Sequence, residues 1–381
     1  MVTKTINISV PDLQPVIWKK LVRIRQTNRV GSAYLFTGPP GCGKEAVAIA
    51  FAKLLNCESL SDTYCGSCPS CRLFATLQHE HLKLVVPLPT GKSSGDNKGS
   101  VLDNLPQSSV DLLTAAIQEK AKNPFHKIMI PKANRIRIDS IRELRKTLYL
   151  KSQVSGQKVV LIFDAHLLSA GQGEAANALL KILEEPPDRT TLVLVTDHKA
   201  DLLPTIVSRC QQVDFPPLET AVVRNVLEQY METEQAQFIA GLAQGDMHRA
   251  LSLSRRATEE LLSIMRKSAL AVVRADGFQW REFVSGLSRL ATSNPDEYIF
   301  NLYLLQLWFK SAYRLRIGLA DELHLEGLLN DLRTFNEGYP NADLNRIGEQ
   351  LEDAITALAQ NRYLPLTLIN LLIGIQRSLR K

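Results

Sequence analysis

The sequence of 381 residues lacks an apolar run long enough to cross a membrane. Its richest apolar stretch, residues 298–309, is shorter than the roughly 20 residues that a spanning helix needs, and Asn301 and Gln306 interrupt it. The first residues, MVTKTINISVPDL, contain no apolar segment beside a basic one and no small-residue cleavage site. We therefore expect a cytoplasmic protein that makes no membrane contact.

A strong excess of one charge sign is also missing. The chain has 45 Lys and Arg against 39 Asp and Glu, and the resulting net charge of +6 permits an anionic partner without indicating one. Hydrophobic residues make up 45% of the chain and charged residues 22%, which is typical of folded globular proteins. The length is sufficient for two or three domains.

Short β-rich runs alternate with helical patterns from residue 33 to about residue 215, which predicts a parallel sheet with helices on both faces. Residues 88–123, rich at first in Gly, Ser and Asn, predict a mobile insertion between two sheet elements. After residue 217 the β signal disappears, and apolar positions three and four apart predict helices. The clearest strand candidates are nearly continuously apolar, as in strands buried on both faces: AYLFT (33–37), KLVVP (83–87), KVVLIF (158–163) and TLVLVT (191–196).

The first of these strands leads into the glycine-rich segment GPPGCGKE and then into a helical run. Glycines allow backbone N–H groups to surround phosphate oxygens, the helix N-terminus adds partial positive charge, and the lysine reaches the terminal phosphates. The segment therefore predicts a phosphate-binding loop formed by Gly38, Gly41, Cys42, Gly43, Lys44 and Glu45.

Two groups that an ATPase of this type needs are missing. Glu45 stands where a Ser or Thr hydroxyl normally holds Mg²⁺, and its carboxylate would repel the phosphates. The strand KVVLIF is followed by a single acidic residue, Asp164, where two adjacent acidic residues normally position Mg²⁺ and the attacking water. We therefore expect Mg²⁺-assisted hydrolysis to be impaired and the binding of ATP or ADP to be weak or absent.

Four of the six cysteines lie within residues 57–71, with the spacing C-x7-C-x2-C-x2-C. Tight C-x2-C pairs bring thiolates around one tetrahedral ion, and four sulfur ligands leave no open position for catalysis. In a reducing compartment this clustering favours a metal over disulfides. The sequence thus predicts a structural Zn²⁺ site made by Cys57, Cys65, Cys68 and Cys71.

Taken together, GSAYLFTGPPGCGK, the four-cysteine insert, ANALLKILEEPP (176–187) and the triplet Ser208-Arg209-Cys210 resemble the AAA+ subunits of bacterial replicative clamp loaders. The altered phosphate loop resembles the member of that family that does not hydrolyse ATP. The resemblance implies an α/β AAA+ P-loop core, a small all-α lid and a C-terminal helical collar. We expect these domains over residues 1–214, 215–267 and 268–381.

The same resemblance implies roles for individual residues. Arg209 is expected to act in trans, as an arginine finger on ATP held by a neighbouring subunit, because a guanidinium stabilises charge on a transferring phosphoryl group. Thr196 occupies the position of a polar sensor of the γ-phosphate, and Asp164 that of a catalytic carboxylate. In GDMHRAL (245–251), His248 stands where the family has an arginine that touches phosphate.

The implied role is that of a stator within a hetero-pentamer, which supports the opening of a sliding clamp without necessarily touching it. Residues 131–146 are rich in basic side chains, and Arg135, Arg137 and Arg142 could contact the backbone of primer–template DNA at a helix N-terminus. Ser140 and Glu143 have the spacing of a capping box for that helix.

Two other classes stay open at this point. One is a working ATPase subunit of the same assembly, against which Glu45 and the single Asp164 argue. The other is an unrelated P-loop enzyme such as a nucleotide kinase, in which the cysteine cluster and the Ser-Arg-Cys triplet have no role. No polymerase chemistry is visible in the sequence, and whether the chain is itself an enzyme stays open.

Overall fold

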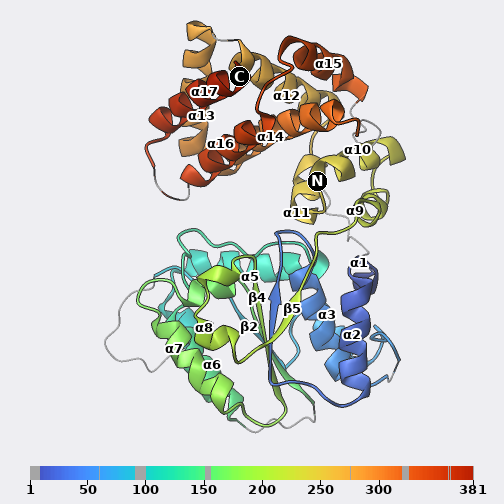
Figure 1. Ribbon diagram of the computed structural model, residues 1–381. Helices are drawn as coiled ribbons and strands as arrows, with labels where there is room; N and C mark the ends of the chain where they lie inside the picture. The colour runs from blue at the N-terminus through green and yellow to red at the C-terminus, as the bar shows by residue number, and fades with distance from the viewer. Residues whose placement is uncertain are drawn as a thin grey trace. The chain divides into compact units, whose positions relative to one another are not determined.

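The computed structural model describes residues 9–59, 61–90, 100–150, 156–274, 276–319, 326–358, 360 and 362–380. The contacts between residues divide the chain into two compact units, coloured by residue number in Figure 1. The first unit comprises residues 1–229 and 244–249, and the second comprises residues 230–243 and 250–381.

The first unit is built around a five-stranded sheet in which every pair is parallel and the order is β2-β3-β4-β1-β5. Its strands are β1 (Ala33–Thr37), β2 (Leu82–Val85), β3 (Lys158–Ile162), β4 (Thr190–Thr196) and β5 (Gln211–Asp214). Its helices are α1 (Val10–Leu13), α2 (Pro15–Gln26), α3 (Lys44–Asn56), α4 (Pro69–Ala75), η1 (Val101–Asn104), α5 (Gln107–Lys122), α6 (Ile138–Leu148), η2 (Ala165–Leu168), α7 (Glu174–Glu184), η3 (Lys199–Asp201), α8 (Pro204–Val207) and α9 (Thr220–Leu227).

Alternating strand residues bury their side chains on opposite faces of the sheet. Leu35 of β1 packs with apolar side chains of β3, β4, α6 and α7, while Tyr34 contacts Phe51 of α3 edge-on at 5.6 Å between ring centroids. Figure 1 shows α2 and α3 on one side of the sheet and α6 and α7 on the other. The predicted parallel sheet with helices on both faces is confirmed.

Two features of this unit differ from the sequence-based expectation. Residues 107–122 of the expected mobile insertion form helix α5, because Val110, Leu113 and Ile117 recur at helical spacing; residues 91–99 lie outside the described residues. The second difference is β5, which completes the sheet beside β1 although its Gln211 and Gln212 are exposed and polar.

The second unit is entirely helical in its described part. Its long central helix, α14, buries twelve side chains and contacts α12, α13, α15 and α16. Trp308, Phe309, Leu351 and Leu371 are all buried in this unit. The helices are α10 (Thr233–Ala243), α11 (Met247–Leu253, whose first residues belong to the first unit), α12 (Thr258–Val273), α13 (Gly277–Ser293), α14 (Pro295–Arg316), η5 (Glu326–Leu328), α15 (Leu329–Gly338), α16 (Leu344–Ala357) and α17 (Leu364–Leu379).

The expected boundary after residue 267 falls inside α12, because residues 268–273 continue the helix without interruption. The division into core, lid and collar otherwise stays a prediction. None of the helices in the described residues is both long and apolar enough to pass through a bilayer. The predicted cytoplasmic location is not tested by this finding and stays a prediction.

Candidate functional site

The phosphate loop joins the end of β1 to the start of α3, at the carboxyl ends of the parallel strands, where ligands bind in sheets of this kind. Gly41 has a φ of +66°, and a Cβ there would lie 1.8 Å from Oδ1 of Asp246. The loop carbonyl of Gly41 also accepts a hydrogen bond of 3.1 Å from the backbone N–H of Met247. Glycine is therefore required at position 41 both by backbone conformation and by the close approach of Asp246.

Lys44, predicted to reach the terminal phosphates, is buried and bound to its own chain. Its ammonium forms an ion pair of 2.6 Å with Oδ1 of Asp197 and donates hydrogen bonds of 2.8 and 2.6 Å to the carbonyls of Gly38 and Pro39. Since an ammonium has three donors, these contacts use them all. Burial alone would raise the pKa of Asp197, but the charge of Lys44 holds that pKa below its usual value.

Glu45 has a cationic partner of its own. Its Oε2 pairs with the ammonium of Lys120, which comes from α5 and is completely buried, while Glu45 keeps 16% of its side chain exposed. Burial alone would raise the pKa of Glu45, but the adjacent positive charge holds it below its usual value. Burial lowers the pKa of Lys120, and Glu45 opposes that effect. The carboxylate expected to repel phosphate is thus neutralised inside the protein.

The third carboxylate, Asp164, follows strand β3 with a left-handed φ of 49°. Its Oδ1 forms an ion pair of 2.9 Å with Lys127. Burial alone would lower the pKa of Lys127, but Asp164 holds it above its usual value. Beside Asp164, the ring of Phe163 lies under the Lys120 ammonium, 5.3 Å from nitrogen to ring centroid. Glu45, Asp164 and Asp197 therefore each have a lysine of this chain as partner.

Very little space is left beside the loop. Among the described residues, the cavity there measures about 20 Å³, and Phe125 and His248 complete its lining with Lys44, Glu45 and Asp197. Pockets that hold nucleotide-sized ligands measure roughly 300–1,000 Å³. The phosphate loop keeps its glycines and lysine, and the cavity that borders it is far smaller than such pockets. Weak or absent nucleotide binding stays a prediction.

Thr196 ends β4 as predicted, but its hydroxyl is buried and contacts two histidine residues. Its Oγ1 lies 3.0 Å from Nδ1 of His166 and accepts a hydrogen bond of 3.0 Å from the backbone N–H of His198. The next residue, Asp197, is the one that reaches Lys44. The role of Thr196 as a phosphate sensor stays a prediction.

Arg209 follows the short helix α8 and is partly exposed, with 38% of its side chain accessible. Its Nη2 forms an ion pair of 2.9 Å with Glu184 at the end of α7, and its Nη1 donates a hydrogen bond of 3.1 Å to the carbonyl of Thr205. The structure therefore places Arg209 at the protein surface, apart from the lysines and carboxylates of the phosphate loop.

The four predicted metal ligands converge. The sulfur atoms of Cys57, Cys65, Cys68 and Cys71 all lie within 4.8 Å of one another, and Cys65 and Cys71 are 4.0 Å apart. Zn–S bonds of about 2.3 Å in a tetrahedron place sulfurs roughly 3.8 Å apart. Backbone N–H groups of Cys68 and Ser67 lower the pKa of Cys65 to about 6, whereas burial raises the pKa of Cys71. The cluster is positioned to hold a metal ion.

Helix α2 holds the cysteine module from outside. The guanidinium of Arg25 donates hydrogen bonds of 2.8 and 2.6 Å to the carbonyls of Cys57 and Ser59, and the indole N–H of Trp18 donates one of 3.1 Å to the carbonyl of Asp62. These bonds tie the loop between the first two cysteines to a helix that is itself packed on α3. The module is therefore an integral part of the first unit.

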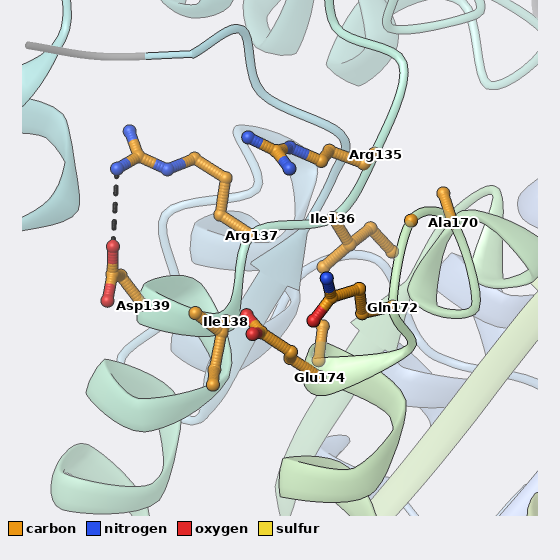
Figure 2. A pocket seen from close by; sticks show the side chains of 10 residues that line it. Arg135, Ile136, Arg137, Ile138, Asp139, Ala170, Gln172 and Glu174 are labelled. Carbon is orange, nitrogen blue, oxygen red and sulfur yellow. Dashed lines mark hydrogen bonds and ion pairs between the residues drawn. The ribbon is translucent and has the colours of Figure 1, made fainter.

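The basic segment lines a separate pocket of about 380 Å³ at the N-termini of α6 and α7 (Figure 2). Arg135 is exposed, whereas Arg137 is partly buried and pairs with Asp139 at 3.2 Å. Arg142 is 62% exposed. The predicted capping box is wrong, because α6 already begins at Ile138 and the Glu143 carboxylate instead accepts hydrogen bonds of 2.9 and 2.8 Å from residues 100 and 101.

Residues that complete the loop's ion pairs were missed by sequence reasoning. Asp197 carried a weak signal, since it directly follows a buried strand at the edge where the loop lies. Lys120 carried none, because it lies in the segment 88–123 that was predicted to be a mobile insertion. Phe125 and Lys127, just beyond that segment, belong to no motif.

Comparison with known proteins identifies the family of the first unit's sequence. A family model described as "DNA polymerase III, delta subunit" matches residues 13–219, which contain the phosphate loop, the cysteine cluster and Arg209. The chain belongs to this family. The resemblance drawn from the sequence motifs is thus confirmed, and the first unit has the predicted parallel sheet with helices on both faces.

Three relatives, all named as subunits of DNA polymerase III, are about 30% identical to this chain over the aligned residues. DNA polymerase III subunit delta' of Bacillus subtilis is 30% identical over 245 residues, 64% of this chain and 60% of the relative. The protein of the same name from Pseudomonas aeruginosa is 29% identical over 282 residues, 73% of this chain and 66% of the relative. DNA polymerase III subunit tau of Bacillus subtilis is 30% identical over 248 residues, 63% of this chain and 36% of the relative.

The chain thus spans 36% to 66% of the length of these relatives. A solved gamma-subunit-related protein of DNA polymerase III from Thermotoga maritima covers 95% of this chain and 99% of its own, with 18% identity and a TM-score of 0.40.

Proposed function

We propose that this chain is a subunit of a bacterial clamp loader that does not hydrolyse ATP itself. It acts as a stator while the sliding clamp is loaded onto primed DNA, and it presents Arg209 to ATP held by a neighbouring subunit. The observation that carries this proposal is the filled phosphate loop. Three lysines of the chain pair with Glu45, Asp164 and Asp197 beside it, and the cavity that borders it measures about 20 Å³.

The surroundings of Arg209 support a role in trans. Two of its nitrogens are held within the chain, by Glu184 and by the Thr205 carbonyl, and the guanidinium keeps further N–H donors. An exposed ion pair of this kind contributes only about 0–1 kcal/mol, so a phosphate can replace Glu184 at low cost. An arginine that is already oriented by these contacts, and that can leave Glu184 at low cost, suits an interface that forms around ATP.

Reconstitution with companion ATPase subunits tests this role. Arg209→Ala is expected to lower turnover at the neighbouring site by roughly 10³-fold or more, and Arg209→Lys to restore little of it, because an ammonium lacks the planar fork of a guanidinium. Arg224→Ala is the matched control, since Arg224 is equally exposed at 38% and also pairs with a glutamate. Unchanged turnover in the assembly with Arg209→Ala would refute the finger.

The isolated chain separates this proposal from its alternative. A catalytically active subunit of the gamma or tau kind hydrolyses ATP by its own loop, whereas we expect no Mg²⁺-dependent turnover from the purified chain. Rapid hydrolysis that is lost on Lys44→Ala would favour the alternative.

The four clustered cysteines support a structural Zn²⁺ ion, because a closed set of sulfur ligands gives substrates no access to the metal.

The helical second unit supports a role in assembly. Leu366, Ile369 and Ile373 of α17 are exposed on one helix face, an arrangement suited to packing against other subunits of a hetero-pentamer. We expect Leu366→Asp with Ile373→Asp to abolish co-elution with those subunits while leaving the helical content of the chain unchanged.

Primer–template DNA is the proposed partner of the pocket in Figure 2, where Arg135, Arg137 and two helix N-termini face the same space. Such groups bind backbone phosphates without reading base sequence. In the assembled complex, Arg135→Ala is expected to reduce the slope of log affinity against log salt by about one unit for each phosphate that the arginine neutralises. A slope equal to that of the wild type would argue against DNA binding at this pocket.

A further inference from the structure

Two elements hold Mg²⁺ in P-loop ATPases: the residue after the loop lysine, and the end of the strand that carries the acidic residues. In this chain those elements are Glu45 at the start of α3 and the segment Phe163-Asp164 after β3. Both of them meet at one side chain. Lys120 pairs with Glu45, and its nitrogen lies 5.3 Å from the ring centroid of Phe163.

We propose that the ammonium of Lys120 takes the place of the magnesium ion, so that this loop excludes the metal by means of its own cation. Lys120 contacts both elements, since its ammonium pairs with the carboxylate of Glu45 and lies over the ring of Phe163. Its side chain has no exposed surface. Lys127 adds a second positive charge 2.9 Å from Asp164. The two lysines together carry the charge of one divalent cation.

Helix α5 supplies this cation. Leu113 and Lys120 are its two buried residues, whereas eight of its sixteen residues are exposed. The attachment of α5 at its C-terminal end therefore depends strongly on the ion pair with Glu45. A magnesium ion placed beside the same carboxylate would meet an ammonium that cannot move into water without exposing a buried pair.

The proposal explains why Glu45 is tolerated at a position that normally carries a hydroxyl. Without a cationic partner, the carboxylate of Glu45 would attract a metal ion and repel phosphate. Beside Lys120 its charge is compensated, so both effects are weakened. Removal of the lysine should consequently convert the position into a metal site. This behaviour is independent of Arg209 and of any neighbouring subunit.

The test is metal binding by the full chain after Lys120→Met, followed by Mn²⁺ electron paramagnetic resonance and by thermal unfolding at increasing Mn²⁺. We expect one Mn²⁺ to bind roughly tenfold or more tightly than to the wild type, with an unfolding midpoint that rises with Mn²⁺ concentration. Glu45→Gln combined with Lys120→Met should abolish the gain. Lys122→Met is the matched control, because Lys122 lies on the same helix, is 54% exposed and pairs with Glu119.

A folded Lys120→Met chain without added Mn²⁺ affinity would overturn the proposal, as would an equal gain in Lys122→Met or a gain that survives Glu45→Gln. Lys120→Gln keeps a hydrogen-bond donor toward Glu45 without the charge, and it replaces Lys120→Met in the same measurements if the latter does not fold. If the Mn²⁺ affinity of Lys120→Gln equals that of the wild type, the proposal that the Lys120 ammonium takes the place of the metal is wrong.

Discussion

The phosphate loop and the cysteine cluster lie in the same unit, and both have the sequence spacing of a ligand site. Their local charges differ. Around the loop, Glu45, Asp164 and Asp197 each have a lysine of the chain as partner, so these three negative charges are compensated by the chain itself. In the cluster, four sulfurs lie within 4.8 Å of one another, an arrangement that an ion of opposite charge stabilises. Motif spacing alone does not separate a cluster of like groups from a site whose charges the chain itself compensates.

Loss of the metal from the cysteine cluster should have the largest effect. Cys71→Ser removes a completely buried ligand, and because structural Zn²⁺ binding contributes directly to folding, we expect the unfolding midpoint of the first unit to fall by about 10 °C or more. Zinc content by mass spectrometry and circular dichroism on heating would measure both. Cys210→Ala, which alters a cysteine outside the cluster, should keep one zinc per chain. Zinc-free wild type with an unchanged midpoint would contradict a structural metal.

An intermediate effect is expected from Glu45→Ala. This change leaves the ammonium of Lys120 buried without its partner, which costs about 3–5 kcal/mol of unfolding free energy. Urea unfolding of the first unit is the measurement. Glu119→Ala, which breaks the exposed pair with Lys122 on the same helix, should cost less than about 0.5 kcal/mol. Equal losses in the two variants would mean that the loop does not depend on its internal ion pair.

The smallest effect concerns pH and the pair of Asp197 with Lys44. The pKa of Asp197 is lower in the folded chain than in the unfolded chain, so the pair stabilises fully above about pH 4 and loses its contribution as the pH falls through the folded-state value. Asp197→Asn should cost about 1–2 kcal/mol at pH 7 and should flatten the loss of stability in acid. Urea titrations at several pH values would check this, with Glu228→Gln at a surface pair as control. An acid slope identical to that of the wild type would rule out this source of the pH dependence.

The parts of the fold that could be predicted from the sequence are those specified by neighbouring residues. Strands β1 to β4 were located within two residues of their ends because their apolar runs are continuous, and the cysteine cluster because its spacing is local. β5 was missed because its exposed Gln211 and Gln212 give no β pattern. Helix α5 was missed because the Gly- and Ser-rich residues before it suggested a loop.

The residues that close the phosphate loop could not be predicted for a different reason. Glu45 and Lys120 are 75 residues apart, and no periodic pattern relates them. The sequence drew attention to Glu45 and Asp164, but it offered no means of identifying Lys120 and Lys127, which pair with them. Long-range charge pairing depends on the packed structure, in which α5 lies across the carboxyl ends of the strands (Figure 1).

The Glu45–Lys120 pair also bears on how this loop can change over generations. Substitution of either residue alone strands a charge in the interior, whereas replacing both together by uncharged residues removes the penalty. A change at one of the two positions is therefore unfavourable by itself, and we expect the two residues to change together although they lie 75 positions apart in the sequence.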